Sequence, residues 1–482
     1  MKFSSRLLPV LLCLLLPAVP RAQATEDANQ TKLKSSEIKS LSKKLQQWYE
    51  ILIKQFDFEN ELSGRTRSKA ERKKVRKYRS DARKKRDAFE NEFEKRCKSS
   101  KINILGSMPD MLEIMDGCFP YKRMSNGGVI KRETVLPSGN ERYPYAIRWP
   151  KKYKPETKSW PMILALPHRD KGKWVKPKEF IETDWSNDLE AVAENYIVAV
   201  PEFPEDSNLS KIYGPGEEMD EKAVKDKDRL LVIFGDLIAK FRVDTDRVFL
   251  EANAQSVPFA LRIVSLFPHR IAGLILKNPQ GITNCTAANL TLVPTLIISD
   301  AANKPTGTEL AKTLAQAKVI DAKGEMPFAA NGPEIAEWMA GVKRPLFSQH
   351  LVYSPVLDAY RKAYWAQILN AELVADKQPK LEVNAHRKTN KISTTAANIG
   401  KLRLLLNAPI FNLDKDVPVQ YIGTRVQHIK RTRNKRLVWD PVESLVLATG
   451  DQGWIFTTVA DFEVPKPEDE PSKAEASSGT DK

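Results

Sequence analysis

Five short runs of uninterrupted apolar residues constrain the fold more than any other feature of this 482-residue chain. The runs occupy residues 162–166, 196–200, 248–250, 273–276 and 295–298. Segments this short that are apolar on both faces are typical of central strands in a parallel sheet, which helices cover on both sides. Helical patterns fall between and after them, at 221–241 and 333–339. The sequence therefore predicts an α/β domain over residues 126–345.

A basic helical region precedes this domain, over residues 25–125. Residues 31–100 contain 22 Lys and Arg against 11 Asp and Glu, which supplies +11 of the chain's formal charge of +16. Apolar residues recur there at steps of three and four, first from Ile38 to Leu52 and, after Ser63-Gly64, from Val75 to Phe93. This spacing predicts a helical hairpin or one long broken helix, and its heptad-like stripe also allows self-association.

The basic residues are densest between Arg65 and Arg86, where 13 Lys and Arg occur. Such a cluster is either a binding surface for an acidic polysaccharide or anionic surface, or a solvated helical face. The candidate contact residues are Arg65, Arg72, Lys74, Arg79, Arg83 and Arg86. Aromatic residues do not alternate with the basic ones as base stacking requires, so the sequence does not favour nucleic acid as a partner.

The two ends of the chain carry their own signals. Residues 1–24 combine Lys2 and Arg6, an apolar run at 7–16, and small residues before Thr25, which predicts a cleavable signal peptide and a secreted or periplasmic protein. No other stretch approaches the roughly 20 apolar residues of a membrane span.

The segment after the α/β domain differs from it in pattern. Residues 346–464 read as a β-rich domain, with strands expected at 401–406, 417–421, 436–439 and 454–459. The tail at 465–482 is rich in Pro, Glu and Ser and is expected to be disordered.

Three cysteines remain once the signal segment is set aside: Cys97, Cys118 and Cys285. Cys97 and Cys118 either pair with each other or stay reduced. None of the three has the spacing of a zinc or redox motif, so we expect no metal and no cofactor.

The apolar run at 248–250 leads into Ala252-Asn253-Ala254-Gln255-Ser256 and then a helical pattern at 257–267. This order resembles the nucleophile elbow of the α/β-hydrolase superfamily, in its branch of secreted esterases, depolymerases and dienelactone-hydrolase-like proteins. The resemblance implies an α/β-hydrolase-like, mostly parallel sheet. The elbow pattern is Gly-x-Ser-x-Gly, and the nucleophile position holds Ala254, whose methyl group cannot attack a carbonyl.

The resemblance also locates the other catalytic positions. It places Asn303 at the acid position and Glu325 where a histidine would be typical, after the strand expected at 317–321. The oxyanion segment at 167–172 lacks most of its glycines. We therefore expect no catalytic residues, and a catalytically inactive homologue that binds an unknown small molecule or polymer in the former cleft.

Two other functions stay open. One is an active serine ester hydrolase with a displaced triad of Ser256, Asp300 and His168. Ser256 would lie in the first helical turn, where helix capping is its other role. The second is an envelope or matrix protein that works through its basic helix.

Overall fold

The computed structural model describes residues 33–464 apart from internal gaps. The gaps are 63–65, 100–106, 119–120, 122–123, 125–127, 136–140, 156–157, 186–191, 193, 214–216, 281–286, 327, 346, 357–359, 372–377, 408, 413–414, 422–425 and 430–457. Several predictions fall outside the described residues: the signal segment 1–24, Arg65, Cys285, the strand at 436–439 and the tail at 465–482.

An eight-stranded sheet forms the centre of the α/β domain, with the order β1-β2-β6-β3-β7-β8-β9-β10. Its strands are β1 (Val129–Val135), β2 (Arg142–Arg148), β3 (Trp160–Ala165), β6 (Ile197–Pro201), β7 (Val243–Asn253), β8 (Gly273–Lys277), β9 (Thr295–Ser299) and β10 (Ala317–Asp321). Strand β2 is antiparallel to both of its neighbours, and the strands from β6 to β10 are parallel. The predicted fold class, a mostly parallel α/β sheet, is confirmed.

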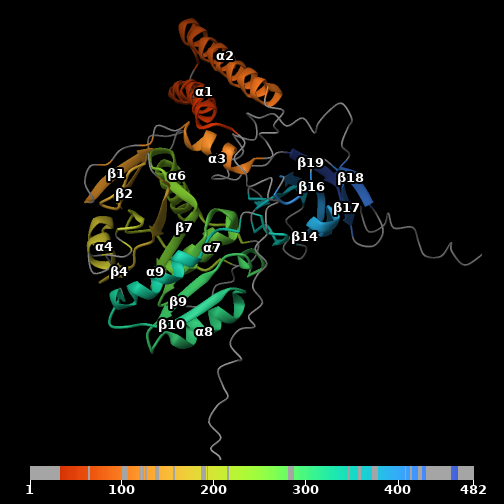
Figure 1. Cartoon of the computed structure of the whole chain (residues 1–482). Coiled ribbons are helices and arrows are strands. Elements are labelled where there is room, and N and C mark those ends of the chain that lie inside the picture. The colour runs from red at the N-terminus through yellow and green to blue at the C-terminus, as the bar shows by residue number, and fades with distance from the viewer. Residues whose placement is uncertain are drawn as a thin grey trace, which may run out of the picture.

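Helices cover both faces of this sheet (Figure 1). They are α4 (Pro177–Asp184), α6 (Glu221–Lys240), α7 (Val257–Leu266), α8 (Lys304–Thr313) and α9 (Gly332–Gly341). Leu250 packs in one core cluster with Leu237 of α6 and Leu261 of α7. The preceding residue of β7, Phe249, packs in a second core cluster with Phe180 of α4 and residues of α9. Because successive strand residues point to opposite faces, strand parity decides which helices each side chain meets.

The strands differ from the predicted runs mainly in length. Strand β7 spans eleven residues, whereas its apolar run covers only 248–250. Polar residues extend it in both directions, and the C-terminal extension carries Glu251 and Asn253 into the sheet. Strand β1, at the edge of the sheet, contains no apolar run, because Lys131, Arg132 and Glu133 lie in its middle.

Three helices form the N-terminal region: α1 (Ser35–Glu61), α2 (Lys69–Ser99) and α3 (Met108–Asp116). The apolar stripe of α1, with Leu41 and Leu45 fully buried, packs against Phe89 of α2 and Ile114 of α3. The stripe that suggested self-association is therefore covered within the chain. Arg242 joins this region to the sheet, because its Nε donates to Oδ2 of Asp116 over 2.8 Å. No helix among the described residues is long and apolar enough to cross a membrane.

Cys118 is a buried thiol in the helical region, and burial raises its pKa above the ordinary value. It packs in the same core cluster as the apolar stripe of α1, and Cys97 is one of the partly buried residues packed against that cluster. The disulfide that was one of two alternatives for Cys97 and Cys118 is not formed in this structure.

Two small sheets follow the α/β domain. The five-stranded sheet has the order β11-β14-β15-β17-β18 and the four-stranded sheet the order β12-β13-β16-β19. Their strands are β11 (His350–Tyr353), β12 (Lys362–Ala363), β13 (Ala366–Ala371), β14 (Lys380–His386), β15 (Lys391–Ala397), β16 (Ile399–Leu406), β17 (Val417–Tyr421), β18 (Val426–Ile429) and β19 (Thr458–Glu463). Both sheets contribute to one core, in which Trp365 is fully buried.

Candidate functional site

The backbone turns sharply where β7 ends. Asn253 is extended, Ala254 has a φ of 44°, and a 3₁₀ turn over Ala254–Ser256 leads directly into α7. A positive φ in a residue with a Cβ costs roughly 1–2 kcal/mol, so alanine holds a strained conformation here. Ala254 is only partly buried, at the carboxyl end of a central strand. The sequence predicted a nucleophile elbow at this position, and the turn has the strained strand-to-helix form of one.

Ser256, the alternative nucleophile, closes this turn from inside. Its side chain is fully buried, and its Oγ accepts from the backbone N–H of Asn253 over 2.9 Å. The same Oγ lies 3.0 Å from the Asn253 carbonyl oxygen, to which it donates. Both contacts stay within the 3₁₀ turn, where Ser256 forms a capping box with Asn253. Its side chain makes no cap bond to α7, so the helix-capping role that the sequence offered is not seen for that helix.

A buried ion pair lies beside the turn, between adjacent strands. Nζ of Lys277, the last residue of β8, is 2.8 Å from Oε1 of Glu251 in β7, and the side chains are 1% and 0% exposed. Strand parity points both toward the α4 face, where Nζ of Lys277 also lies 5.1 Å from the ring centroid of Trp185. Forming a salt bridge that is shielded from water costs more desolvation free energy than forming a surface pair. Such a pair therefore requires further polar partners.

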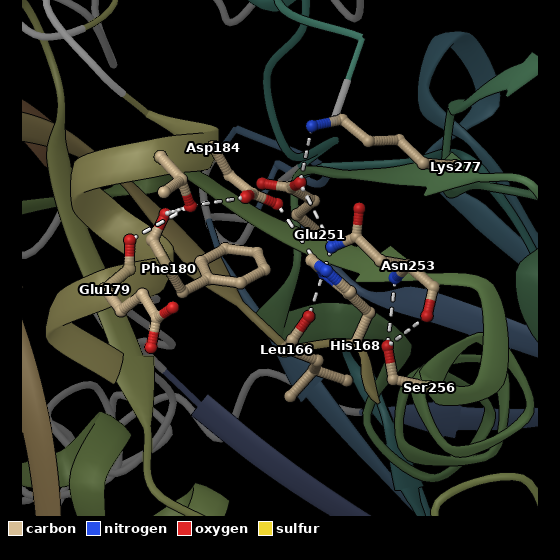
Figure 2. Close-up of polar contacts among 10 residues, drawn as sticks. Leu166, His168, Glu179, Phe180, Asp184, Glu251, Asn253, Ser256 and Lys277 are labelled. Carbon is tan, nitrogen blue, oxygen red and sulfur yellow. Dashed lines mark hydrogen bonds and ion pairs between the residues drawn. The ribbon is translucent and has the colours of Figure 1, made fainter. Parts of the chain in front are cut away.

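Asn253 of the same strand provides one such partner, and His168 and Asp184, from two other segments, lie nearby, as Figure 2 shows. Asn253 donates from Nδ2 to Oε1 of Glu251 over 3.3 Å and to the Leu166 carbonyl over 3.2 Å. His168 follows the end of β3, and its Nδ1 lies 3.7 Å from Oδ2 of Asp184, the last residue of α4. That separation is longer than a hydrogen bond. We call Glu251, Lys277, Asn253, His168 and Asp184 the buried polar cluster.

Electrostatics in the buried polar cluster favour neutral forms of two of its members. Burial lowers the pKa of His168, and the charge of Lys277 lowers it further. Burial raises the pKa of Asp184 to about 6, with Lys277 opposing that rise and Glu251 adding to it. A catalytic histidine in a triad must accept a proton and become imidazolium. The surroundings of His168 disfavour that charge.

The oxyanion segment forms a tight hairpin instead of an open glycine turn. Strands β4 (Arg169–Asp170) and β5 (Lys173–Trp174) pair with each other, and Lys171 and Gly172 between them have φ values of 47° and 82°. Arg169 fixes the hairpin by donating to the carbonyl oxygens of Glu205 and Ser207 over 2.8 Å and 2.9 Å. Two positive φ values at the turn centre are typical of two-residue hairpins.

Asp300 lies at the end of β9 in a separate set of hydrogen bonds. Its Oδ1 accepts from the N–H and Nδ2 of Asn303 over 2.9 Å and 3.0 Å, and its Oδ2 accepts from Nδ2 of Asn278 over 2.6 Å. Burial alone would raise the pKa of Asp300, but these hydrogen bonds outweigh burial and leave the pKa below its ordinary value. Asp300 is therefore a fixed carboxylate that its asparagine neighbours orient.

The structure gives a definite place to each of the predicted site residues. Asn303 contacts Asp300, and Glu325 is exposed in the loop between β10 and α9. Within the described part of the chain, no hydrogen bond or ion pair joins Ser256, His168 and Asp300 to one another. The described residues also contain no group of three or more His, Cys, Asp or Glu placed to hold a metal ion.

The sequence analysis missed Glu251, Lys277 and Asp184. A signal for the ion pair was present, because Glu251 and Lys277 each follow an apolar run directly. Carboxyl ends of parallel strands meet at one edge of a sheet, so opposite charges at two such ends predict a pair if the strands are neighbours. Asp184 carried no comparable signal, because its burial depends on how α4 packs.

Solved structures that resemble part of this chain share little sequence with it. Neither models of protein families nor curated proteins give a match to the chain. Among solved structures, it resembles a thermostable esterase at 16% identity and a TM-score of 0.36, over 46% of this chain and 65% of that one. It resembles a ferulic acid esterase at 12% identity and a TM-score of 0.36, over 45% and 99% of the two chains.

A substrate-bound fluorophosphonate-binding serine hydrolase F of Staphylococcus aureus is also similar, at 10% identity and a TM-score of 0.32, over 45% of this chain and 98% of that one. The match to the thermostable esterase spans less than two thirds of that protein. The likeness is distant and covers under half of this chain. The strand order and the helical layers given above define an α/β fold with a mostly parallel sheet.

Proposed function

We propose that this protein is a catalytically inactive α/β-hydrolase homologue that binds a ligand at the turn following β7. One observation carries the proposal: Ala254 keeps a strained positive φ although its methyl group cannot be a nucleophile. Strain of this kind persists where surrounding structure enforces it, and it is concentrated at functional sites. A turn that had lost all use would gain stability by relaxing or by acquiring glycine.

The neighbouring groups support loss of chemistry over a displaced triad. Both hydrogen bonds of the Ser256 side chain are made with the backbone of Asn253. His168 has a lowered pKa, and Asp184 is too far from it to hold the ring by a hydrogen bond. Asp300 is committed to Asn278 and Asn303. Each of the three alternative catalytic residues thus lies in surroundings that oppose its catalytic role.

The polar atoms around the turn support a chemical class of ligand. Oε1 of Gln255 and Oε2 of Glu251 are buried acceptors with no hydrogen-bond partner among the described residues. Buried acceptors are ordinarily satisfied by a protein group, a water molecule or a ligand. A ligand that displaces the groups covering these atoms and donates to them carries hydroxyl or amino groups, as a sugar or a polyol does.

Two measurements test this proposal. The first treats the mature protein with a serine-reactive fluorophosphonate and assays a panel of carboxylic esters. We expect no stoichiometric labelling and no saturable turnover. Labelling that Ser256→Ala abolishes would establish the displaced-triad hydrolase instead.

The second measurement follows the thermal midpoint in the presence of sugars, polyols and amino alcohols. We expect at least one compound to raise the midpoint of the wild type but not of Ala254→Trp, which fills the turn. Gly172→Ala, in the β4-β5 hairpin, is a control for nonspecific damage by a residue at positive φ. A panel without any effect on the wild type would contradict ligand binding at this turn.

A further inference from the structure

The N-terminal half of α2 carries a continuous basic stripe on its solvent side. The stripe consists of seven exposed residues: Lys69, Arg72, Lys73, Arg76, Lys77, Arg83 and Lys84. The opposite side of the helix is the packed one, where Val75 is buried and Ala82 and Phe89 share a core cluster with α1. In Figure 1, α2 lies at the edge of the molecule, next to α1 and away from the sheets.

Within the described part of the chain, these seven cations have no ion-pair or cation–π partner, whereas several other basic residues of α2 do. Arg79 pairs with Glu59 over 3.1 Å, Arg86 pairs with Glu90 over 2.8 Å, and Lys74 lies 4.1 Å from the ring centroid of Phe58. None of the seven stripe residues makes an ion pair with the described part of the chain. Lys74, Arg79 and Arg86, which the sequence offered as candidate contact residues, make these contacts within α1 and α2.

Helical spacing arranges the stripe in two columns. At 100° per residue, Arg72, Arg76 and Arg83 align along one edge, and Lys73, Lys77 and Lys84 align beside them. With a rise of 1.5 Å per residue, the stripe runs for about 22 Å along the helix. Glu71 and Asp81 fall outside this sector, so no carboxylate interrupts it.

The arrangement is unfavourable for the helix itself. Like charges four residues apart, as at Arg72 and Arg76 or Lys73 and Lys77, destabilise a helix by roughly 0.2–0.5 kcal/mol a pair. Cations also lie in its first turns, where the helix dipole favours acidic residues. A helical face that is only solvated does not require so many charges of one sign. An anionic partner would remove both penalties.

We infer that the stripe is a binding site for a linear anionic polysaccharide that carries sulfate or carboxylate groups. Clustered cations gain affinity for a polyanion by releasing its condensed counterions. The stripe is one helix wide and holds no exposed aromatic residue for base stacking. It also holds no apolar residue to embed in a bilayer, as interfacial helices have. The export predicted from residues 1–24 places the protein where such polysaccharides occur.

The test compares two variants of the full mature chain with equal loss of charge. Arg72→Gln, Arg76→Gln and Arg83→Gln together remove one column, and Lys151→Gln, Lys152→Gln and Lys173→Gln remove three exposed lysines of the α/β domain. Binding of labelled dextran sulfate is measured from 50 to 300 mM NaCl, with uncharged dextran, duplex DNA and phosphatidylserine vesicles as the other probes.

We expect the wild type to bind dextran sulfate but not dextran. The stripe variant should bind at least tenfold more weakly near 100 mM salt. When log Kd is plotted against the logarithm of the salt concentration, its slope should be smaller than that of the wild type by about 2–3. It should also have a thermal midpoint equal to or above that of the wild type, which shows that it folds. Equal losses in both variants, no binding at 50 mM salt, or tighter binding to DNA or vesicles would overturn the assignment. None of these outcomes depends on a ligand at the turn after β7.

Discussion

Nζ of Lys277 lies 2.8 Å from Oε1 of Glu251, and both side chains are shielded from water by α4 and Trp185. The pair joins the ends of two adjacent parallel strands, β7 and β8, next to the strained turn. An apolar contact could fill the same place between these strands. The ion pair instead connects the buried polar cluster to the central strands.

Removing one charge of this pair should be far more damaging than removing both. We expect Lys277→Met to lower the free energy of unfolding by about 3–5 kcal/mol, because it leaves Glu251 buried and unpaired. Adding Glu251→Gln should recover most of that loss. Urea unfolding of the single variants and the double variant checks the prediction, and additive losses would show that the two side chains do not interact.

The stability of the protein should depend on the charge of Asp184. Its pKa is raised from 3.8 to about 6 by burial, so the folded protein holds this proton more tightly than the unfolded chain. The resulting stability is complete below pH 3.8 and is lost as the pH rises through about 6. Asp184→Asn stays neutral and should match the wild type at low pH, then exceed it by on the order of 2 kcal/mol at pH 7.5.

A control of opposite sign is available for the Asp184 experiment. Asp206 is exposed, and its hydrogen bond with Lys222 lowers its pKa. Its contribution is present above the ordinary pKa and lost as the pH falls through the lowered value. Asp206→Asn should therefore give no gain at pH 7.5. A gain equal to that of Asp184→Asn would mean that general charge reduction, not burial, is responsible.

The sequence predicted the central sheet well because the strands concerned are buried on both faces. Apolar runs marked β3, β6, β8 and β9 to within one or two residues. It did not predict β1 or the strands between 350 and 397, where polar residues alternate with apolar ones or the strand is only two residues long. Such strands depend on pairing partners that are distant in sequence.

The candidate site could be predicted in part for the same physical reason. The strand, the small residues and the following helix locate Ala254 through local pattern alone. The ion pair of Glu251 and Lys277 arises because β8 lies beside β7, and the raised pKa of Asp184 arises because α4 covers that edge. Both depend on packing between segments, which local pattern does not specify.

Placing a serine at the elbow should not restore a reactive nucleophile. We expect Ala254→Ser to resist fluorophosphonate, because a serine needs a base within hydrogen-bond reach. The lowered pKa of His168 opposes the charge it would have to accept, and its Nδ1 lies 3.7 Å from Oδ2 of Asp184, too far for a hydrogen bond that would orient the ring. Mass spectrometry of the intact treated protein measures the result, with an active serine esterase as the positive control. Labelling of the variant would show that a base is still in place.

Replacing Ala254 by glycine tests whether the strain at the turn is real. Glycine adopts a φ of 44° without the roughly 1–2 kcal/mol that a Cβ costs, but its greater freedom in the unfolded chain offsets about 0.5–1 kcal/mol of that gain. Ala254→Gly should therefore raise the free energy of unfolding by about 0.5 kcal/mol.

Ala260, a buried residue in the middle of α7, provides the matched control for that substitution. Ala260→Gly has no strain to relieve, and it loses helix propensity and a buried methyl group, at a cost of about 1–2 kcal/mol. Urea unfolding distinguishes the two signs. If both glycine variants were destabilised equally, Ala254 would not hold a left-handed conformation in solution. The main support for a retained binding turn would then be lost, while the basic stripe on α2 would be unaffected.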